Sequence, residues 1–198
     1  MKILVATHNP GKLKELKVLL DGLPAELVLL DDIGIHDEIE ETGATFEANA
    51  RLKASGYAAR SRLLTLADDS GLEVDALGGE PGVYSARYGG PGKNDDDRNQ
   101  LVLEKMREVP EGQRAARFRC VIAVADPGKE LFTAEGAVEG AIAYQPRGSN
   151  GFGYDPIFWM AEYGATLGQL GPEIKNQVSH RSRAVRAARP RLEMLIKP

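Results

Sequence analysis

Residues 66–72, Leu-Ala-Asp-Asp-Ser-Gly-Leu, constrain the fold of this chain more than any other stretch, because an apolar strand runs directly into two carboxylates. A strand buried on both faces is ordinarily apolar along its length. We therefore expect Asp68 and Asp69 at the rim of a sheet, where α/β proteins place their ligands. Adjacent side chains of an extended chain point to opposite faces, so one acid can face a ligand while the other braces the backbone. Gly71 would then permit a turn.

Carboxylates in such a place suit Mg²⁺, which proteins commonly hold with one or two carboxylates plus substrate phosphates. The alternative is that Asp-Asp-Ser-Gly is only a favourable turn. A second acid-rich segment, residues 37–43, contains Glu40 and Glu41. It is either a solvated acidic loop or the source of a further metal ligand.

The composition excludes several classes of protein. With 198 residues, the chain can form one large domain or two closely packed lobes. Its net charge of -4 gives no excess positive field for duplex DNA or RNA, so we expect no nucleic-acid partner. No apolar run approaches the length of a membrane span, and the apolar N-terminus is too short for a signal peptide. The single cysteine, Cys120, lies in an apolar strand and fits a core thiol in a reducing cytoplasm.

A phosphate site is predicted close to the N-terminus. Residues 2–7 read as a buried strand, and leucines at helical spacing begin at Leu13. Between them Asn9 is a favoured N-cap and Pro10 a favoured first helical residue. Free N–H groups at such a helix start attract phosphate, and Lys12 adds a full charge. The spacing is not that of a Walker A loop, and an ordinary strand–turn–helix unit is the alternative.

The rest of the chain alternates between strand and helix patterns. A helix over about 46–60 follows a Thr45 cap, with Asn49 and Lys53 on one face. Lys53 points either to water or to bound phosphate. The acids at 95–97 are explained by the dipole of a helix that starts there, and we do not interpret them as a metal site. Strands are further predicted at about 25–30, 72–76 and 117–126, one or two more at 130–143, and a helix at about 94–106.

Two C-terminal segments complete the candidate site. Residues 147–156 combine three glycines with Phe152 and Asp155, which can stack on a base and accept hydrogen bonds; a glycine-rich surface loop is the alternative. Residues 175–181 then lead into a basic helix that Pro190 should kink or divide.

Five motifs stand in a recognisable order. They are Thr7-His8-Asn9-Pro10-Gly11-Lys12, Glu40-Glu41-Thr42-Gly43, Ala67-Asp68-Asp69-Ser70-Gly71, Gly151-Phe152-Gly153-Tyr154-Asp155-Pro156 and Ser179-His180-Arg181. Together they resemble the signature set of the inosine triphosphate pyrophosphatase (Ham1/RdgB) family, over nearly the whole chain. Two departures are small: His8 stands where a small residue is frequent, and Trp159-Met160 replaces a more usual ending after the Gly-Tyr-Asp-Pro loop.

The resemblance implies one domain over residues 1–198, with an elongated mixed α/β sheet flanked by helices, two lobes and a cleft between them, usually as a homodimer. It implies hydrolysis of non-standard purine nucleoside triphosphates (ITP, dITP and XTP) to the monophosphate and pyrophosphate with Mg²⁺. Such an enzyme would cleanse the cytoplasmic nucleotide pool.

Residue roles follow from the resemblance and from side-chain chemistry. We expect Asp69 to be metal ligand and proton acceptor, with Asp68 orienting or assisting it, and Glu40 rather than Glu41 to be the second acid on the metal. The triphosphate would be bound by residues 7–12, Lys53 and Ser70. The base would be held by Phe152, Gly153, Tyr154, Asp155, Lys175, His180 and Arg181. Donors among these favour the C6 oxygen of hypoxanthine and leave the amino group of adenine mispaired.

Three rival functions remain open. A Maf-type pyrophosphatase would act on pyrimidine triphosphates, a nucleotide sensor would bind without turnover, and an RNA-binding module would use the basic helix. The paired acids argue against the sensor, because a binder has no need of a metal at the scissile phosphate.

Overall fold

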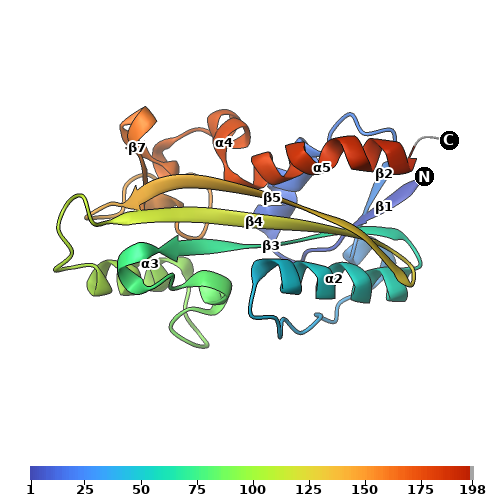
Figure 1. The fold of residues 1–198 in the computed structure, drawn as a ribbon, viewed down its shortest axis with the longest axis horizontal. Helices are drawn as coiled ribbons and strands as arrows, with labels where there is room; N and C mark the ends of the chain where they lie inside the picture. Colours follow the sequence, from blue (N-terminus) through green and yellow to red (C-terminus); the bar gives the residue numbers. More distant parts are fainter. Residues whose placement is uncertain (197–198) are drawn as a thin grey trace. The chain divides into compact units, whose positions relative to one another are not determined.

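The computed structural model describes residues 1–196, which form a mixed α/β fold (Figure 1). Seven strands make one sheet in the order β2-β1-β3-β4-β5-β6-β7. The strands are β1 (Lys2–Val5), β2 (Glu26–Leu29), β3 (Leu64–Val74), β4 (Ala115–Asp126), β5 (Lys129–Ile142), β6 (Phe158–Met160) and β7 (Ala165–Thr166). The helices are α1 (Pro10–Leu19), α2 (Phe46–Ser61), α3 (Asp95–Lys105), α4 (Pro172–Val178) and α5 (His180–Ile196). The predicted α/β class with a mixed sheet and flanking helices is confirmed.

The chain divides into two compact units. One part of each of the strands β3, β4 and β5 belongs to unit 1, and the other part belongs to unit 2. Unit 1 comprises Met1–Asp69, Cys120–Gly136 and the chain from His180 onward. Unit 2 comprises Ser70–Arg119 and Ala137–Ser179.

Unit 1 is built around parallel strands. β1 pairs in parallel with both β2 and β3, and Val5 lies opposite Leu66. Helices α1 and α5 bury their apolar sides against one face of these strands, where Leu16 and Val185 join the core formed with Leu66. Helix α2 lies on the other side of the strands from α5 (Figure 1). The strands of unit 1 are thus covered on both faces, as expected for parallel pairing.

Unit 2 has its own core, in which Val102 of α3 and Met106, the residue after this helix, join Phe118 and Phe158. Strand β6 pairs antiparallel with β5 and with β7. Parallel pairs in unit 1 and antiparallel pairs in unit 2 therefore make the sheet mixed.

Helix starts follow the local capping chemistry that the sequence contains. The Asn9 side chain accepts from the Lys12 amide, and Pro10 opens α1. Thr45 accepts from the Ala48 amide at the start of α2. Asn94 and Asp97 form a capping box at the start of α3. Each side chain satisfies a backbone N–H that has no partner within its helix, which confirms the three predicted helix starts.

Two expectations about the elements were wrong. Strand β3 runs without a break from Leu64 to Val74, so Asp68 and Asp69 lie inside it and Gly71 makes no turn there. The separate strand predicted at 72–76 is its second half. Helix α5 continues undivided past Pro190, and the kink given as the alternative stays a prediction. Strands β6 and β7 and helix α4 were not predicted, because elements this short carry little periodicity.

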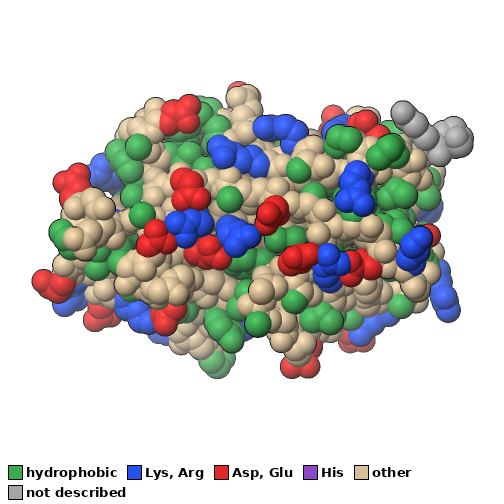
Figure 2. Space-filling model, in the orientation of Figure 1, with side chains coloured by type: hydrophobic (Ala, Val, Ile, Leu, Met, Phe, Trp, Pro, Cys, Tyr) green, Lys and Arg blue, Asp and Glu red, His purple; other side chains and the backbone are tan. Residues whose placement is uncertain are grey.

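Acidic and basic side chains are interspersed on the face shown in Figure 2. In unit 1 Arg51 pairs with Glu47 and Glu130, and in unit 2 Arg117 pairs with Asp75. Mixed signs of this kind keep the local field small. Among the described residues, no helix has the length and apolar character needed to span a membrane.

Candidate active site

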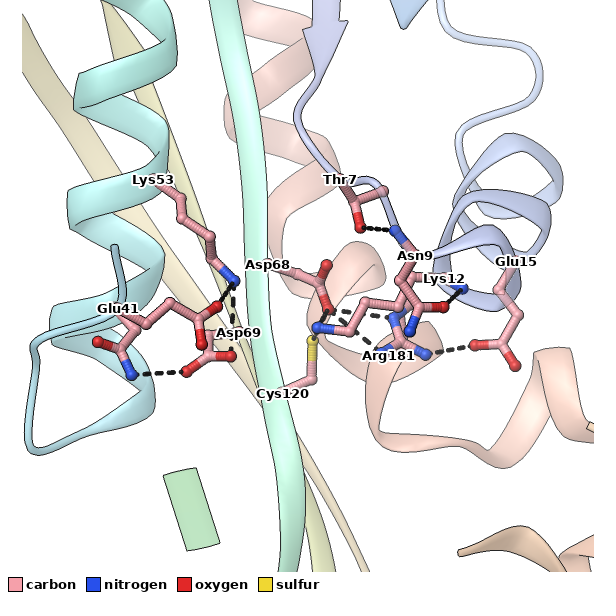
Figure 3. A network of polar contacts seen from close by, with 11 residues as sticks. Thr7, Asn9, Lys12, Glu15, Glu41, Lys53, Asp68, Asp69, Cys120 and Arg181 are labelled. Carbon is pink, nitrogen blue, oxygen red and sulfur yellow. Dashed lines mark hydrogen bonds and ion pairs between the residues drawn. The ribbon is translucent and has the colours of Figure 1, made fainter. Parts of the chain in front are cut away.

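Asp68 and Asp69 project from opposite sides of β3 (Figure 3). Both are buried, with exposed fractions of 1% and 5%. The alternation of a strand places Asp68 on the side of Leu66, which faces α1 and α5, and Asp69 on the opposite side. The predicted inequivalence of the two acids is therefore confirmed, although they lie in the middle of a strand.

Helix α2 supplies the partners of Asp69. The Lys53 ammonium lies 3.5 Å from Asp69 Oδ1 and 2.6 Å from Glu41 Oε1. The Asn49 amide donates to Asp69 Oδ2 at 3.1 Å. Lys53 thus links two carboxylates that come from separate parts of the sequence (Figure 3).

The electrostatics of this side favour a basic carboxylate. Burial raises the pKa of Asp69 above its ordinary value, and the attraction of Lys53 offsets this only in part. Burial alone would lower the pKa of Lys53, but the charges of Asp69, Asp68 and Glu41 raise it. Lys53 therefore stays charged at neutral pH, while Asp69 has a stronger affinity for a proton than an exposed aspartate has.

The other side of β3 holds Asp68 between two cations. Lys12 Nζ lies 3.2 Å from Asp68 Oδ2, and the Arg181 guanidinium donates to the same oxygen through Nε and Nη2 at 3.3 and 3.2 Å. Burial would raise the pKa of Asp68, but Lys12 and Arg181 hold it well below its usual range. Asp68 is consequently a permanent anion, suited to pairing with cations and unsuited to accepting a proton.

Arg181 is buried with only 1% of its surface exposed, and it also donates to Glu15 of α1. Burial alone would lower the pKa of its guanidinium, but the negative charge of Asp68 outweighs this effect and raises the pKa above its ordinary value. The thiol of Cys120 lies 3.9 Å from Asp68 Oδ2, and burial together with that negative charge raises the pKa of the thiol to about 12. The predicted core thiol is confirmed.

The start of α1 is organised as the sequence predicts. Thr7 Oγ1 accepts from the Asn9 amide, and Asn9 Oδ1 accepts from the Lys12 amide at 3.0 Å. Pro10 and Gly11 form the beginning of the helix. His8 packs edge-on against Tyr57 of α2, with ring centroids 6.3 Å apart.

Unit 2 holds a second cluster of predicted site residues. Asp155 accepts from the Phe152 amide at 2.8 Å and from the Lys175 ammonium. Lys175 Nζ also lies 4.6 Å from the centroid of the Phe152 ring. Gly151 adopts a φ of +78°, and a Cβ there would overlap the Asp155 carboxylate, so this turn requires glycine.

Helix α3 fixes the same loop at Gly153. The Gly153 amide donates to Asp95 at 2.7 Å, and its carbonyl accepts from Asn99 at 3.0 Å. The Tyr154 hydroxyl donates to the Ser85 carbonyl, which places the Tyr154 side chain in the core of unit 2. Asp95 therefore binds the loop in addition to starting a helix.

Comparison with known proteins decides the family. The model of the Ham1 family matches residues 3–191. The chain belongs to the Ham1 family. A dITP/XTP pyrophosphatase of Geobacter sulfurreducens is 50% identical over 184 residues, which cover 93% of this chain and 92% of that protein. A dITP/XTP pyrophosphatase of Bacillus subtilis is 48% identical over 190 residues, 96% of each chain. The solved Ham1 protein of Staphylococcus aureus superposes with a TM-score of 0.88 at 40% identity, covering 98% of this chain and 100% of that one.

Residues of one Ham1 motif have different surroundings in the structure. Of the two neighbouring glutamates in the acidic segment 37–43, Glu41 contacts Lys53, whereas the side chain of Glu40 is exposed to solvent. The guanidinium of Arg181, expected at the base, binds Asp68 and Glu15. Ser70 is half-buried in β3, and His180 is buried at the start of α5.

Sequence reasoning missed Glu15 and Asn99. It placed Asn49 on the helix face of Lys53 and Asp95 at a helix start, but it predicted neither the contact of Asn49 with Asp69 nor that of Asp95 with Gly153. The sequence contained a signal for Glu15 and Asn99. Glu15 lies three residues after Lys12, and Asn99 lies four residues after Asp95, so each pair shares one face of its helix.

The donor set fits Mg²⁺ that is held partly by substrate. Within residues 1–196 no group of three His, Cys, Asp or Glu side chains gathers to hold a metal. Two carboxylates, Glu41 and Asp69, do share the Lys53 ammonium. Mg²⁺ typically takes one or two carboxylates and completes its shell with waters and phosphate oxygens.

Asp68→Asn tests the ion pairs on the α1 and α5 side. The substitution removes the carboxylate that the half-buried Lys12 and the buried Arg181 share, and it leaves Arg181 with Glu15, so we expect the free energy of unfolding to fall by about 3 kcal/mol. Urea unfolding followed by circular dichroism measures this change.

The matched control is Asp75→Asn, which removes one exposed partner of Arg117 and should leave the free energy of unfolding close to that of wild type. Equal losses in the two variants would contradict a stabilising role for buried Asp68.

Proposed function

We propose that this Ham1 protein hydrolyses the non-standard purine triphosphates ITP, dITP and XTP to the monophosphate and pyrophosphate. Relatives that match at 48–50% identity over more than nine-tenths of the chain carry the name dITP/XTP pyrophosphatase. The observation that carries the proposal is the group formed by Asp69, Lys53 and Glu41: a carboxylate with a raised pKa, an ammonium and a second acid.

Asp69 would act as the proton acceptor. A water oxygen bonds to phosphorus as the bridging P–O bond breaks, pyrophosphate leaves, and the proton of the water passes to Asp69. Its raised pKa increases its basicity toward that proton. Lys53 and Lys12 would balance the charge of the triphosphate, together with the N–H groups at the start of α1.

Glu41, in place of Glu40, would be the second acid toward Mg²⁺. It lies against Lys53, beside Asp69, whereas Glu40 is exposed. When bound, Mg²⁺ would neutralise charge on the phosphates and hold them in line for attack. Asp68 would keep Lys12 in place through the ion pair on the other side of β3.

The loop at Phe152–Asp155 and Lys175 would hold the purine. Phe152 offers an aromatic face, and Lys175 and His180 are donors that match an oxygen at C6. Adenine presents an amino group there, which leaves a donor facing a donor. Arg181 would serve the site through Asp68, since its guanidinium is committed to Asp68 and Glu15.

The family resemblance also leads us to propose a magnesium-dependent homodimer in the cytoplasm. A single buried cysteine is compatible with a reducing compartment. Light scattering on the purified chain tests the dimer.

A substrate panel tests the reaction. We expect pyrophosphate release from ITP, dITP and XTP to exceed that from ATP by at least about 100-fold in kcat/KM, since donors that face the amino group of adenine are mispaired. Guanine shares the C6 oxygen, so a lower release from GTP would depend on its 2-amino group. Release from CTP, UTP and dTTP should also be lower. A chelator of divalent cations should abolish pyrophosphate release. Preference for pyrimidines would instead indicate a Maf-type activity, and tight ITP binding without turnover would indicate a sensor.

Asp69→Asn tests the proton acceptor. The amide keeps the shape of the side chain but accepts no proton, so we expect kcat to fall by about 100-fold or more. Circular dichroism and calorimetric titration with dITP should show an intact fold and nucleotide binding. Near-normal turnover in this variant would remove Asp69 from its role.

The pair Glu41→Gln and Glu40→Gln tests the second acid. Loss of the charge beside Lys53 and Asp69 should lower kcat/KM by about 100-fold in Glu41→Gln. Glu40→Gln, an identical change one residue away on an exposed side chain, should remain close to wild type. The reverse order would return the metal-binding role to Glu40.

A further inference from the structure

We propose that Asn49 is a positioning residue, which fixes the Asp69 carboxylate and the segment that carries Glu41 in one arrangement. The inference deepens the proposed pyrophosphatase function and rests on it.

Asn49 makes one hydrogen bond to each of the two parts that it would hold. Its side chain in α2 is fully buried, with an exposed fraction of 0%. Nδ2 donates to Asp69 Oδ2 at 3.1 Å, and Oδ1 accepts from the Gly43 amide at 2.7 Å. A single planar amide therefore joins the middle of β3 to the acidic segment.

The two partners determine which way the amide points. A carboxylate oxygen only accepts, and a backbone N–H only donates, so the nitrogen must face Asp69 and the oxygen must face Gly43. The donor bond occupies Asp69 Oδ2 while Oδ1 lies 3.5 Å from Lys53. The carboxylate is thereby held from both oxygens.

The backbone at Gly43 lies so close to α2 that a side chain at residue 43 would not fit. A Cβ on Gly43 would lie 2.7 Å from Ala48 Cβ and 2.7 Å from Asn49 Oδ1. The backbone of the acidic segment therefore rests directly on the first turns of α2. Glu41 is two residues from this anchor, so the bond that Asn49 makes to Gly43 limits how far Glu41 can move from Lys53.

Tyr57 provides a matched comparison on the same helix. Its hydroxyl donates to the Asp37 carbonyl and accepts from the Ile39 amide, so it also fastens the acidic segment to α2. Its bonds reach this segment and not Asp69. Loosening of the segment alone can therefore be separated from loss of the bond to Asp69.

The test uses the variants Asn49→Leu, Asn49→Asp and Tyr57→Phe of the full chain. Leucine has a similar size but forms neither bond, while aspartate keeps an acceptor for Gly43 and loses the donor to Asp69. We expect kcat for dITP to fall about 10- to 100-fold in both Asn49 variants, with KM within about threefold, because residues that orient an active-site carboxylate act mainly on turnover. Tyr57→Phe should keep kcat within about threefold of wild type.

Amide hydrogen exchange, measured by NMR without nucleotide, supplies a readout independent of turnover. Exchange at Gly43 should accelerate in Asn49→Leu and stay slow in Asn49→Asp. Circular dichroism establishes that each variant is folded, and Asn49→Asp keeps the test decisive where Asn49→Leu does not fold.

Two results would overturn the proposal: wild-type kcat in Asn49→Asp, or a loss of kcat in Tyr57→Phe as large as in Asn49→Leu. Absence of pyrophosphate release from the wild-type chain would overturn the proposed function instead, and the exchange at Gly43 would then report whether Asn49 still anchors the segment.

Discussion

The burial of two adjacent carboxylates inside one strand is the constraint on which unit 1 depends. An unpaired charge in a protein interior costs several kcal/mol, so each acid needs a cation of its own. Strand geometry sends Asp68 and Asp69 to opposite faces, and one helix cannot serve both. Lys53 therefore comes from α2, and Lys12 and Arg181 come from α1 and α5. The three helices around β3 are tied to the acids as well as to the apolar core.

The same geometry gives the two carboxylates different chemistry. Two cations hold the pKa of Asp68 down, whereas burial raises the pKa of Asp69 against a single lysine. Neighbouring carboxylates whose pKa values are pushed apart are a recurrent sign of divided roles. One acid remains an anion that keeps Lys12 and Arg181 in place, and its neighbour is left as the better proton acceptor. Adjacent identical residues thus acquire different electrostatic properties from the faces on which they lie.

Local chemistry made part of this structure predictable. The caps Asn9, Thr45 and Asn94 act on backbone groups within three residues, so the sequence alone reveals them. The continuity of β3 was not predictable in this way, because charged residues normally mark the end of a buried strand. Its compensating cations come from distant parts of the chain, and only the tertiary fold brings them to the strand. The contact of Glu41, and not Glu40, with Lys53 was equally hidden, since the acidic segment has no periodicity of its own. Lys53 lies twelve positions beyond Glu41 in the sequence.

In both units a buried asparagine of a helix holds an irregular segment of the chain through a hydrogen bond. A loop that must hold a ligand lacks the repeating backbone bonds that make helices and strands rigid. In unit 1 a buried asparagine of α2 binds the Gly43 amide, and in unit 2 a buried asparagine of α3 binds the Gly153 carbonyl. An amide on a helix offers a donor and an acceptor at fixed positions, so it can satisfy a loop peptide and hold it at the same time. Glycine on the loop lets the backbone of the acidic segment approach α2 closely at residue 43. The helices thereby hold irregular segments in fixed positions. Loops can then carry residues of the candidate site without being rigid by themselves.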